Sequence, residues 1–202
     1  MFGLSTSMAL DPSQESKLYP RLESAYQWQL LKAAPRLYLD KNHPNIWLAE
    51  RLQASFPDAR FIGIERNPYA TVASMMHHHG VVSWFGRWRE FPVPNRFLGI
   101  TEEVAPSYEM LPLATKCAMR WLAHHRRMRE LRDKLADAML MISYETFAYE
   151  TGKTIASIEE FLALKAPLAV PDVKLDSLTK WKQRLSPSEL RQIDKVLIEP
   201  SA

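Results

Sequence analysis

The sequence of 202 residues is poor in cysteine and contains no long apolar segment. Its single cysteine, Cys117, excludes an internal disulfide, and its place in an apolar helical run predicts a buried thiol. No run approaches the roughly 18 apolar residues that a membrane span requires. The first residues, MFGLSTSMALDPSQ, lack a basic stretch followed by an apolar core, so no signal peptide is expected. A reducing, cytoplasmic setting is compatible with this cysteine usage.

The sequence also lacks a strong charge of either sign. The formal net charge is +3, and the isoelectric point is near 9.0. This mild basic excess suits a small anionic ligand and gives no argument for nucleic acid. The hydrophobic share of 47% and the charged share of 24% are ordinary for a globular protein, and we expect one domain over residues 1–202.

Strand-like and helix-like segments alternate along the chain. Residues 1–17 look irregular, and residues 80–105 are an aromatic, proline-rich stretch expected to be a loop, which would make a wall or lid for an acceptor. The patterns predict strands at about 36–41, 60–65 and 138–145, and helices at about 20–33, 44–55, 67–79, 108–135 and 151–164, with two short helices after a loop at 166–174. This alternation predicts an α/β fold, with a parallel sheet flanked by helices. The apolar run at 60–65 is typical of a strand that is covered on both faces.

Two helix starts carry clear signals. Asn67 is an expected N-cap with Pro68 in the first helical position. Near the C-terminus, Ser186 is followed by Pro187 and then by Glu189, three residues after the cap. This spacing predicts a capping box.

All three predicted strands end on polar residues, in the pairs Asp40-Lys41, Glu65-Arg66 and Tyr144-Glu145. Ligands of parallel sheets bind at the carboxyl ends of the strands, so these side chains are expected around one site. Arg66 stands just before a helix N-terminus, where unpaired N–H groups attract anions. Its guanidinium can bind two oxygens of a phosphate or sulfate, and the hydroxyl of Ser74 could donate to the same group. The Lys41 ammonium suits a departing group that carries negative charge.

The segment "LDKNHPN…LAERLQASFPDARFIGIERNPYATVAS" resembles the middle of a sulfotransferase. "LMISYETF…TIASIEEFLAL" and "LDSLTKWKQRLSPSEL" are similar to later parts of that family. The resemblance covers roughly residues 36–198 and is nearest to the tyrosylprotein and Golgi-type branch with its bacterial relatives. It implies the P-loop NTPase-like sulfotransferase fold and transfer of a sulfuryl group from 3′-phosphoadenosine 5′-phosphosulfate (PAPS) to a hydroxyl acceptor, with no metal.

The resemblance also implies roles for individual residues. Arg66 and Ser74 would hold the 3′-phosphate of PAPS, and Tyr144 would contact the nucleotide. Lys180 would close over the phosphates from the C-terminal loop. Lys41 would be the catalytic residue that approaches the sulfuryl group and the bridging oxygen.

One family element has no counterpart in the sequence. A sulfotransferase begins with a strand, a glycine- and Ser/Thr-rich phosphate loop with a basic residue, and a helix. Here "GLSTS" follows no apolar strand and contains no Lys or Arg, so we expect an N-terminally incomplete fold. Two explanations stay open: a fragment that begins after the loop and first helix, or a natural short form that has lost donor activation. The neighbouring strands would then expose apolar edges, which predicts poor solubility or a homodimer. The catalytic base is not identified; Glu15 and Glu23 are candidate stand-ins for the carboxylate that follows the phosphate loop in the resembled family.

Two alternatives to an active sulfotransferase stay open. The chain could be a non-catalytic nucleotide-binding or dimerising remnant, or it could be a small-molecule kinase. The histidines at 77–79 do not point to a metal, because consecutive helical residues diverge by about 100° and cannot all bind one ion.

Overall fold

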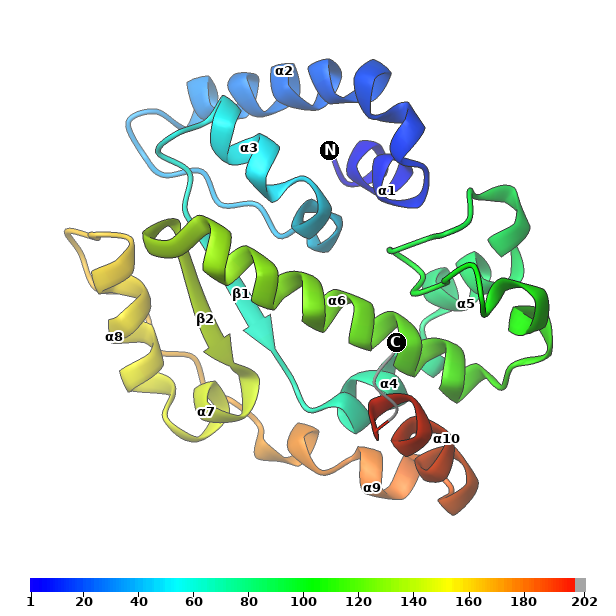
Figure 1. The fold of residues 1–202 in the computed structure, drawn as a ribbon. Helices are drawn as coiled ribbons and strands as arrows, with labels where there is room; N and C mark the ends of the chain where they lie inside the picture. The colour runs from blue at the N-terminus through cyan, green and yellow to red at the C-terminus, as the bar shows by residue number, and fades with distance from the viewer. Residues whose placement is uncertain (199–202) are drawn as a thin grey trace.

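The structure is a computed structural model that describes residues 1–198, and its sheet confirms the predicted parallel α/β class. Figure 1 shows two neighbouring strands, β1 (Phe61–Glu65) and β2 (Met139–Ser143), with helices around them. The strands pair in parallel, and their last residues, Glu65 and Ser143, are register partners. Both strands therefore deliver the following residues to the same edge of the sheet.

The prediction of a strand at residues 36–41 is wrong. This segment has no regular structure, and the side chains of Leu37 and Leu39 are 70% and 82% exposed. A strand needs a neighbour to pair its backbone groups, and within residues 1–198 no strand pairs with this segment. The sheet of the described residues is therefore smaller than expected, with two strands in place of three.

The prediction that residues 1–17 are irregular is also wrong. Helix α1 (Phe2–Leu10) leads through a short turn into α2 (Glu15–Ala33), with Pro20 inside the second helix. The predicted helix at 44–55 is split into a 3₁₀ turn at 43–47 and α3 (Ala49–Ser55). Tertiary packing explains the early helix, because α1 contacts both α2 and the turn at 43–47.

A long helix, α6 (Leu113–Leu135), crosses the molecule beside the sheet in Figure 1. It packs against β2, against α3 and against α4 (Pro68–Met76). It begins five residues later than predicted, after a 3₁₀ segment at 105–110. The helix predicted to run to about residue 79 ends at Met76, and the expected loop at 80–105 is partly helical, since α5 (His79–Gly86) occupies its first part.

The C-terminal third confirms the three predicted helices, α8 (Thr151–Phe161), α9 (Trp181–Arg184) and α10 (Pro187–Ile198), and the loop at 166–174. It also contains α7 (Tyr144–Tyr149), which was not predicted: the strand expected to reach residue 145 ends at Ser143. The capping box before α10 is confirmed, because the Ser186 N–H donates to Glu189 Oε2 at 2.7 Å and the Glu189 N–H donates to Ser186 Oγ at 3.3 Å. The Asn67 cap of α4 is confirmed by its side chain, which accepts from the Ala70 N–H.

The main core lies between α4, α5, α6 and α10, around Val72, Phe97 and Ile193. Cys117 is fully buried there, as predicted. The expectation that β1 is covered on both faces is wrong, since Ile64 is 59% exposed. No helix of the described residues combines the length and apolarity needed to cross a bilayer.

Candidate functional site

The parallel register brings Arg66 and Tyr144 together directly after β1 and β2. The guanidinium carbon of Arg66 lies 4.6 Å from the centre of the Tyr144 ring. This stacking fixes the arginine beside the N-terminus of α4, where Asn67 already satisfies the Ala70 N–H. The predicted meeting of two strand ends is therefore present in the structure.

Arg66 retains unused hydrogen-bonding capacity. Its Nη2 donates to the backbone carbonyl of Ser177 at 2.9 Å. Its Nε is buried and has no partner among the described residues. A buried guanidinium N–H without an acceptor is unfavourable, so this group is ready to bind a ligand oxygen.

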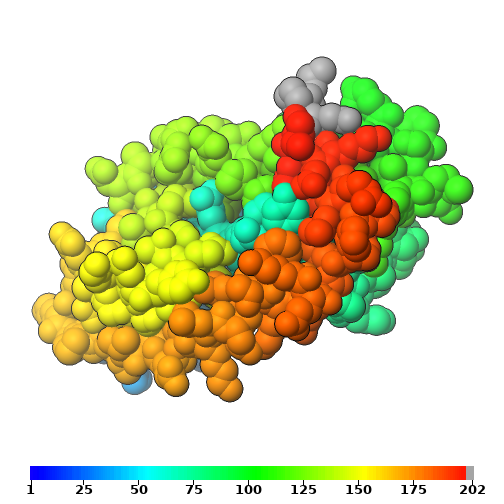
Figure 2. Space-filling model, turned by 90° about the horizontal axis from the view of Figure 1, so that it is seen from below, coloured from blue at the N-terminus to red at the C-terminus, as the bar shows by residue number. Residues whose placement is uncertain are grey.

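A pocket of about 240 Å³ opens at this place. Its lining residues are Arg66, Ala70, Ala73, Ser74, Ser177, Lys180, Trp181 and Arg184. In Figure 2 the teal surface around the end of β1 and the start of α4 lies between the yellow surface that includes α7 and the orange to red C-terminal segment. Three of the five predicted site residues, Arg66, Ser74 and Lys180, thus line one pocket, and a fourth, Tyr144, supports the arginine from behind.

Ser74 reaches the pocket from the exposed side of α4, next to two small residues. Its side chain has no hydrogen-bond partner among residues 1–198, so its hydroxyl is available to a ligand. Ala70 and Ala73 line the same wall, and their methyl groups leave room beside the helix.

The C-terminal segment closes the pocket with two further cations. Lys180 pairs with Asp176 at 2.7 Å, and this contact lowers the pKa of the Asp176 carboxyl. Arg184 lines the pocket one helical turn after Lys180. The sequence reading missed Arg184, although the i, i+4 spacing from a residue already assigned to the site was a usable signal.

Ser177 is a second residue that the sequence reading missed. The Ser177 hydroxyl donates its proton to the Lys174 carbonyl at 3.0 Å. The Tyr144 hydroxyl lies 3.0 Å from Ser177 Oγ, so in this second hydrogen bond Tyr144 is the donor and Ser177 Oγ the acceptor. With the bond from Arg66 to its carbonyl, Ser177 connects the loop after residue 174 to both strand ends. No local pattern marks it as a site residue, because its contacts with Arg66 and Tyr144 are more than 30 residues away in sequence.

The carboxylates at the strand ends do not line this pocket. Glu145 accepts the backbone N–H of Asn67 at 2.9 Å, and Glu65 contacts His125 Nδ1 at 3.2 Å. Both carboxylates therefore interact with other parts of the fold and not with the pocket. The lining is therefore cationic, with Arg66, Lys180 and Arg184 and without a carboxylate.

Lys41 does not join the other predicted site residues in the pocket. It is exposed, and it lies outside the pocket lining, in the segment that was expected to be a strand. The preceding residue, Asp40, is held by the Tyr26 hydroxyl at 2.5 Å. Because residues 36–41 do not enter the sheet, the sheet does not carry Lys41 to its carboxyl edge.

Other parts of the described chain offer neither a metal site nor a clear base. No group of three His, Cys, Asp or Glu side chains that could hold a metal occurs within residues 1–198. His78 instead caps α5, where its Nδ1 accepts from the Val81 N–H. Glu15 pairs with Arg51 at 2.6 Å, so it is committed to an ion pair.

Three cations, a free hydroxyl and an aromatic platform make this pocket suited to a doubly charged phosphate or sulfate group. A family model described as "Sulfotransferase family" matches residues 5–167 of the chain. No curated protein and no solved structure matches the chain.

Proposed function

The chain belongs to the sulfotransferase family, and we propose that it transfers a sulfuryl group from PAPS to a hydroxyl acceptor. One observation carries the choice of donor. The pocket at the ends of β1 and β2 gathers Arg66, Ser74 and Lys180 around a small volume with the charge and hydroxyl donors that a phosphate needs.

The 3′-phosphate of PAPS would occupy this pocket. Arg66 would bind it through the N–H that has no partner within the described chain, and Ser74 would donate its hydroxyl. Lys180 would add charge after exchanging Asp176 for the phosphate, with Arg184 as a further cation. PAPS itself supplies the activated sulfuryl group.

Lys41 is proposed to neutralise the charge that develops on the departing phosphate. Sulfuryl transfer resembles phosphoryl transfer, in which positioning and charge neutralisation dominate. Lys41 is exposed and follows an irregular segment, so its ammonium is free to approach a bound donor. Acceptors would be small molecules, glycans or peptides that carry a hydroxyl.

A second candidate function follows from the same lysine. Lys41 lies outside the lining of the phosphate pocket, and a pocket without a lysine at the sulfuryl group would bind nucleotide without transfer. The chain would then be a nucleotide-binding protein.

Thermal shift with adenosine 3′,5′-bisphosphate tests the pocket. At a concentration 100-fold above Kd, ligand binding adds about 2.7 kcal/mol of stability. For a protein of this size we expect a rise in Tm of about 5–10 °C. Arg66→Ala should remove the shift, whereas Arg129→Ala, an exposed arginine of α6 outside the pocket, should keep it.

The remaining outcomes separate the candidates. A shift together with transfer of labelled sulfate from PAPS supports the sulfotransferase, and a shift without transfer supports the binding protein. A shift with ATP but none with the bisphosphate would point to a kinase and contradict the proposal.

A further inference from the structure

A buried arginine lies outside the lining of the pocket of Arg66. Arg120, in the middle of α6, is 6% exposed, and within residues 1–198 it forms no ion pair with a carboxylate. Arginine is almost never buried without a paired charge, because desolvating a full charge is costly. The buried charge of Arg120 must therefore be compensated by groups other than a carboxylate.

The protein satisfies only part of the Arg120 guanidinium. Its Nη1 lies 3.4 Å from the sulfur of Met75, which is a weak acceptor. Its Nη2 donates to Nε2 of His43 at 3.2 Å, and this imidazole must be neutral to accept. Its Nε is buried with no partner in the described residues.

Aromatic rings supply most of the other contacts. The guanidinium carbon is 4.6 Å from the Phe97 ring centre and 5.7 Å from that of Trp84. Such contacts attract a cation but do not replace the hydrogen bonds that water gave it. Burial lowers the pKa of Arg120 to about 10, so the group is still charged at neutral pH. The nearby Cys117 thiol has its pKa raised by burial to about 12 and stays neutral.

His43 lies between the buried Arg120 guanidinium and the surface of the protein. His43 is exposed, and its ring contacts the rings of Phe2, at 5.6 Å, and of Trp84, at 6.3 Å. Both rings line a groove of about 610 Å³ between α1 and α5. Since its Nε2 accepts from Arg120, the other ring nitrogen of His43 carries a proton and is a second donor.

We propose that Arg120 and His43 form a second oxyanion-binding site, distinct from the phosphate pocket and next to the groove, whose lining rings Phe2 and Trp84 contact His43. The site takes a small oxyanion such as a sulfate or sulfonate, which would accept from the free N–H groups of Arg120 and from His43. The oxyanion is either a free ion or the charged group of an aromatic molecule whose ring lies along Phe2 and Trp84. This site does not depend on the identity of the donor nucleotide.

Sulfate titration of protein labelled with ¹⁵N at histidine tests the site. The Arg66→Ala variant is used, so that the phosphate pocket does not contribute, and chloride keeps the ionic strength constant. We expect the imidazole signals of His43 to shift and saturate. The signals of His125, which stacks on Trp121 and contacts Glu65, should not saturate.

Variants of Arg120 decide whether the site is responsible. Adding Arg120→Met should abolish the saturable shift, and Arg120→Lys should weaken sulfate binding about 10-fold or more, since it keeps a charge without the paired N–H groups. A response that never saturates, or one that survives Arg120→Met, overturns the proposal. If the methionine variant does not fold, unchanged affinity in the lysine variant overturns it equally.

A second ligand identifies the source of the oxyanion. Benzenesulfonate should bind more tightly than sulfate if the charged group belongs to an aromatic molecule in the groove. Equal affinities would assign the site to the free ion. Absence of saturable binding for both ligands contradicts the site.

Discussion

His124 lies on α6 one turn after Arg120, with its ring between aromatic neighbours. Its Nε2 donates to the Phe97 carbonyl at 2.9 Å, and its ring centre lies 5.2 Å from that of Phe97. Burial and the charge of Arg120 hold the pKa of His124 well below its usual range. Burial of its ring among aromatic side chains, together with Arg120 and His78, lowers the pKa of His43 to about 4, although part of the residue is exposed. Both rings are therefore neutral in the folded protein at pH 6, while they bind protons in the unfolded chain.

These two shifts predict that the protein loses stability in mild acid. Below the unfolded pKa of about 6.5, these histidines bind protons in the unfolded chain but not in the folded protein. The free energy of unfolding therefore decreases as the pH is lowered. His124 alone should cost about 1.4 kcal/mol per pH unit. His43 adds less, because one side of it faces solvent. Urea unfolding at pH 7.0 and 5.5 should therefore differ by about 1–2 kcal/mol.

His124→Asn provides the control for the stability change. Its amide can still donate to the Phe97 carbonyl, and it does not titrate. The variant should lose most of the difference between pH 7.0 and 5.5. A wild-type protein that is equally stable at both values, or a variant that keeps the full difference, would contradict the assignment to His124.

Single residues also show what the sequence could reveal about the site. Arg66 was predictable, because its position depends on its own strand and on the cap at Asn67, which are local features. Ser177 was not, because it belongs to the site only through contacts with Arg66 and Tyr144. Lys41 has the residue type and spacing of the family, and its position depends on a strand pairing that is absent from the described residues.

At the scale of elements, α10 depends on its N-terminal capping box. Ser186 and Glu189 each satisfy the backbone N–H of the other, and Glu189 Oε2 also accepts from the Ser186 hydroxyl at 2.8 Å. This cap fixes the start of a helix that packs on α6 through Ile193, which is fully buried. Ser186→Ala should lower the free energy of unfolding by about 1 kcal/mol.

The matched control is Ser188→Ala, two residues further along the same helix. Ser188 is exposed, and within residues 1–198 its hydroxyl forms a single hydrogen bond, which it accepts from the Gln192 side chain at 3.4 Å. Urea unfolding should show a change within about 0.5 kcal/mol for this variant. Equal losses in the two variants would show that the cap does not stabilise the helix.

Elements with a strong local signal were predictable, and those that depend on distant partners were not. The helix at α4 has a cap, a proline and an apolar face, and its start was placed correctly. Helix α1 has only weak local signals, and it is helical because it packs on α2 and because Ser5 donates to Asn45 at 2.7 Å. Helix α5, in the stretch at 80–105, was not predicted. Its N-cap is His78, a residue that is not typical of caps.

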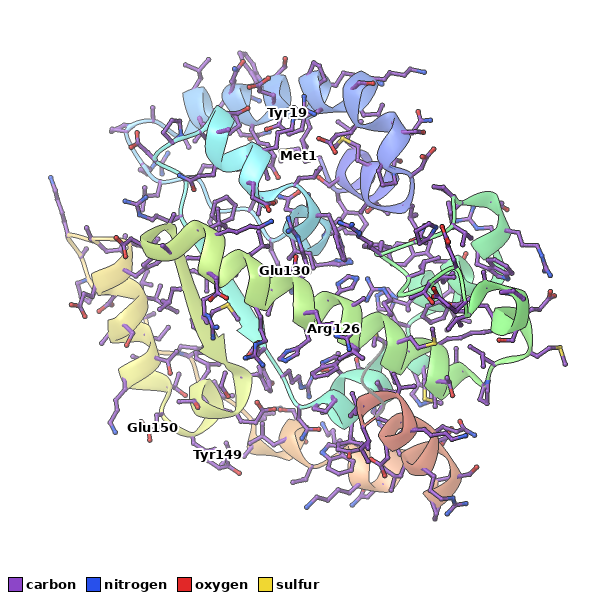
Figure 3. The ribbon with its side chains drawn as sticks, in the orientation of Figure 1. Met1, Tyr19, Arg126, Glu130, Tyr149 and Glu150 are labelled. Atoms are coloured by element: carbon purple, nitrogen blue, oxygen red, sulfur yellow. The ribbon has the colours of Figure 1, made fainter. Side chains whose placement is uncertain are left out.

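At the scale of the molecule, α6 links the two proposed anion sites to one core. It carries Arg120 and packs against α4, whose start forms the pocket of Arg66. The same helix carries three arginines at 126, 127 and 129, and Figure 3 labels Arg126 and Glu130 one turn apart on it. Of these arginines, Arg126 is exposed, whereas Arg127 is tied to Glu50 and to the Ile46 carbonyl. The helix therefore anchors the segment at 43–50 to the core, and with it the residues that follow Lys41.

The two-stranded sheet leaves a free edge and an uncovered apolar side chain. β1 pairs with β2 along one edge, and within residues 1–198 no strand covers the other. Ile64 is 59% exposed on β1. Exposed strand edges with apolar side chains recruit further strands, so we expect this edge to pair with a second copy of the chain.

Size-exclusion chromatography with light scattering should therefore report a dimer, at twice the 23.3 kDa of one chain. Ile64→Lys places a charge at the free edge and should shift the protein towards monomer. Met110→Lys is the control, since Met110 is 86% exposed in the 3₁₀ segment at 105–110, outside the sheet. A stable monomer at micromolar concentration, or a dimer that Ile64→Lys leaves intact, would show that this edge is not an interface.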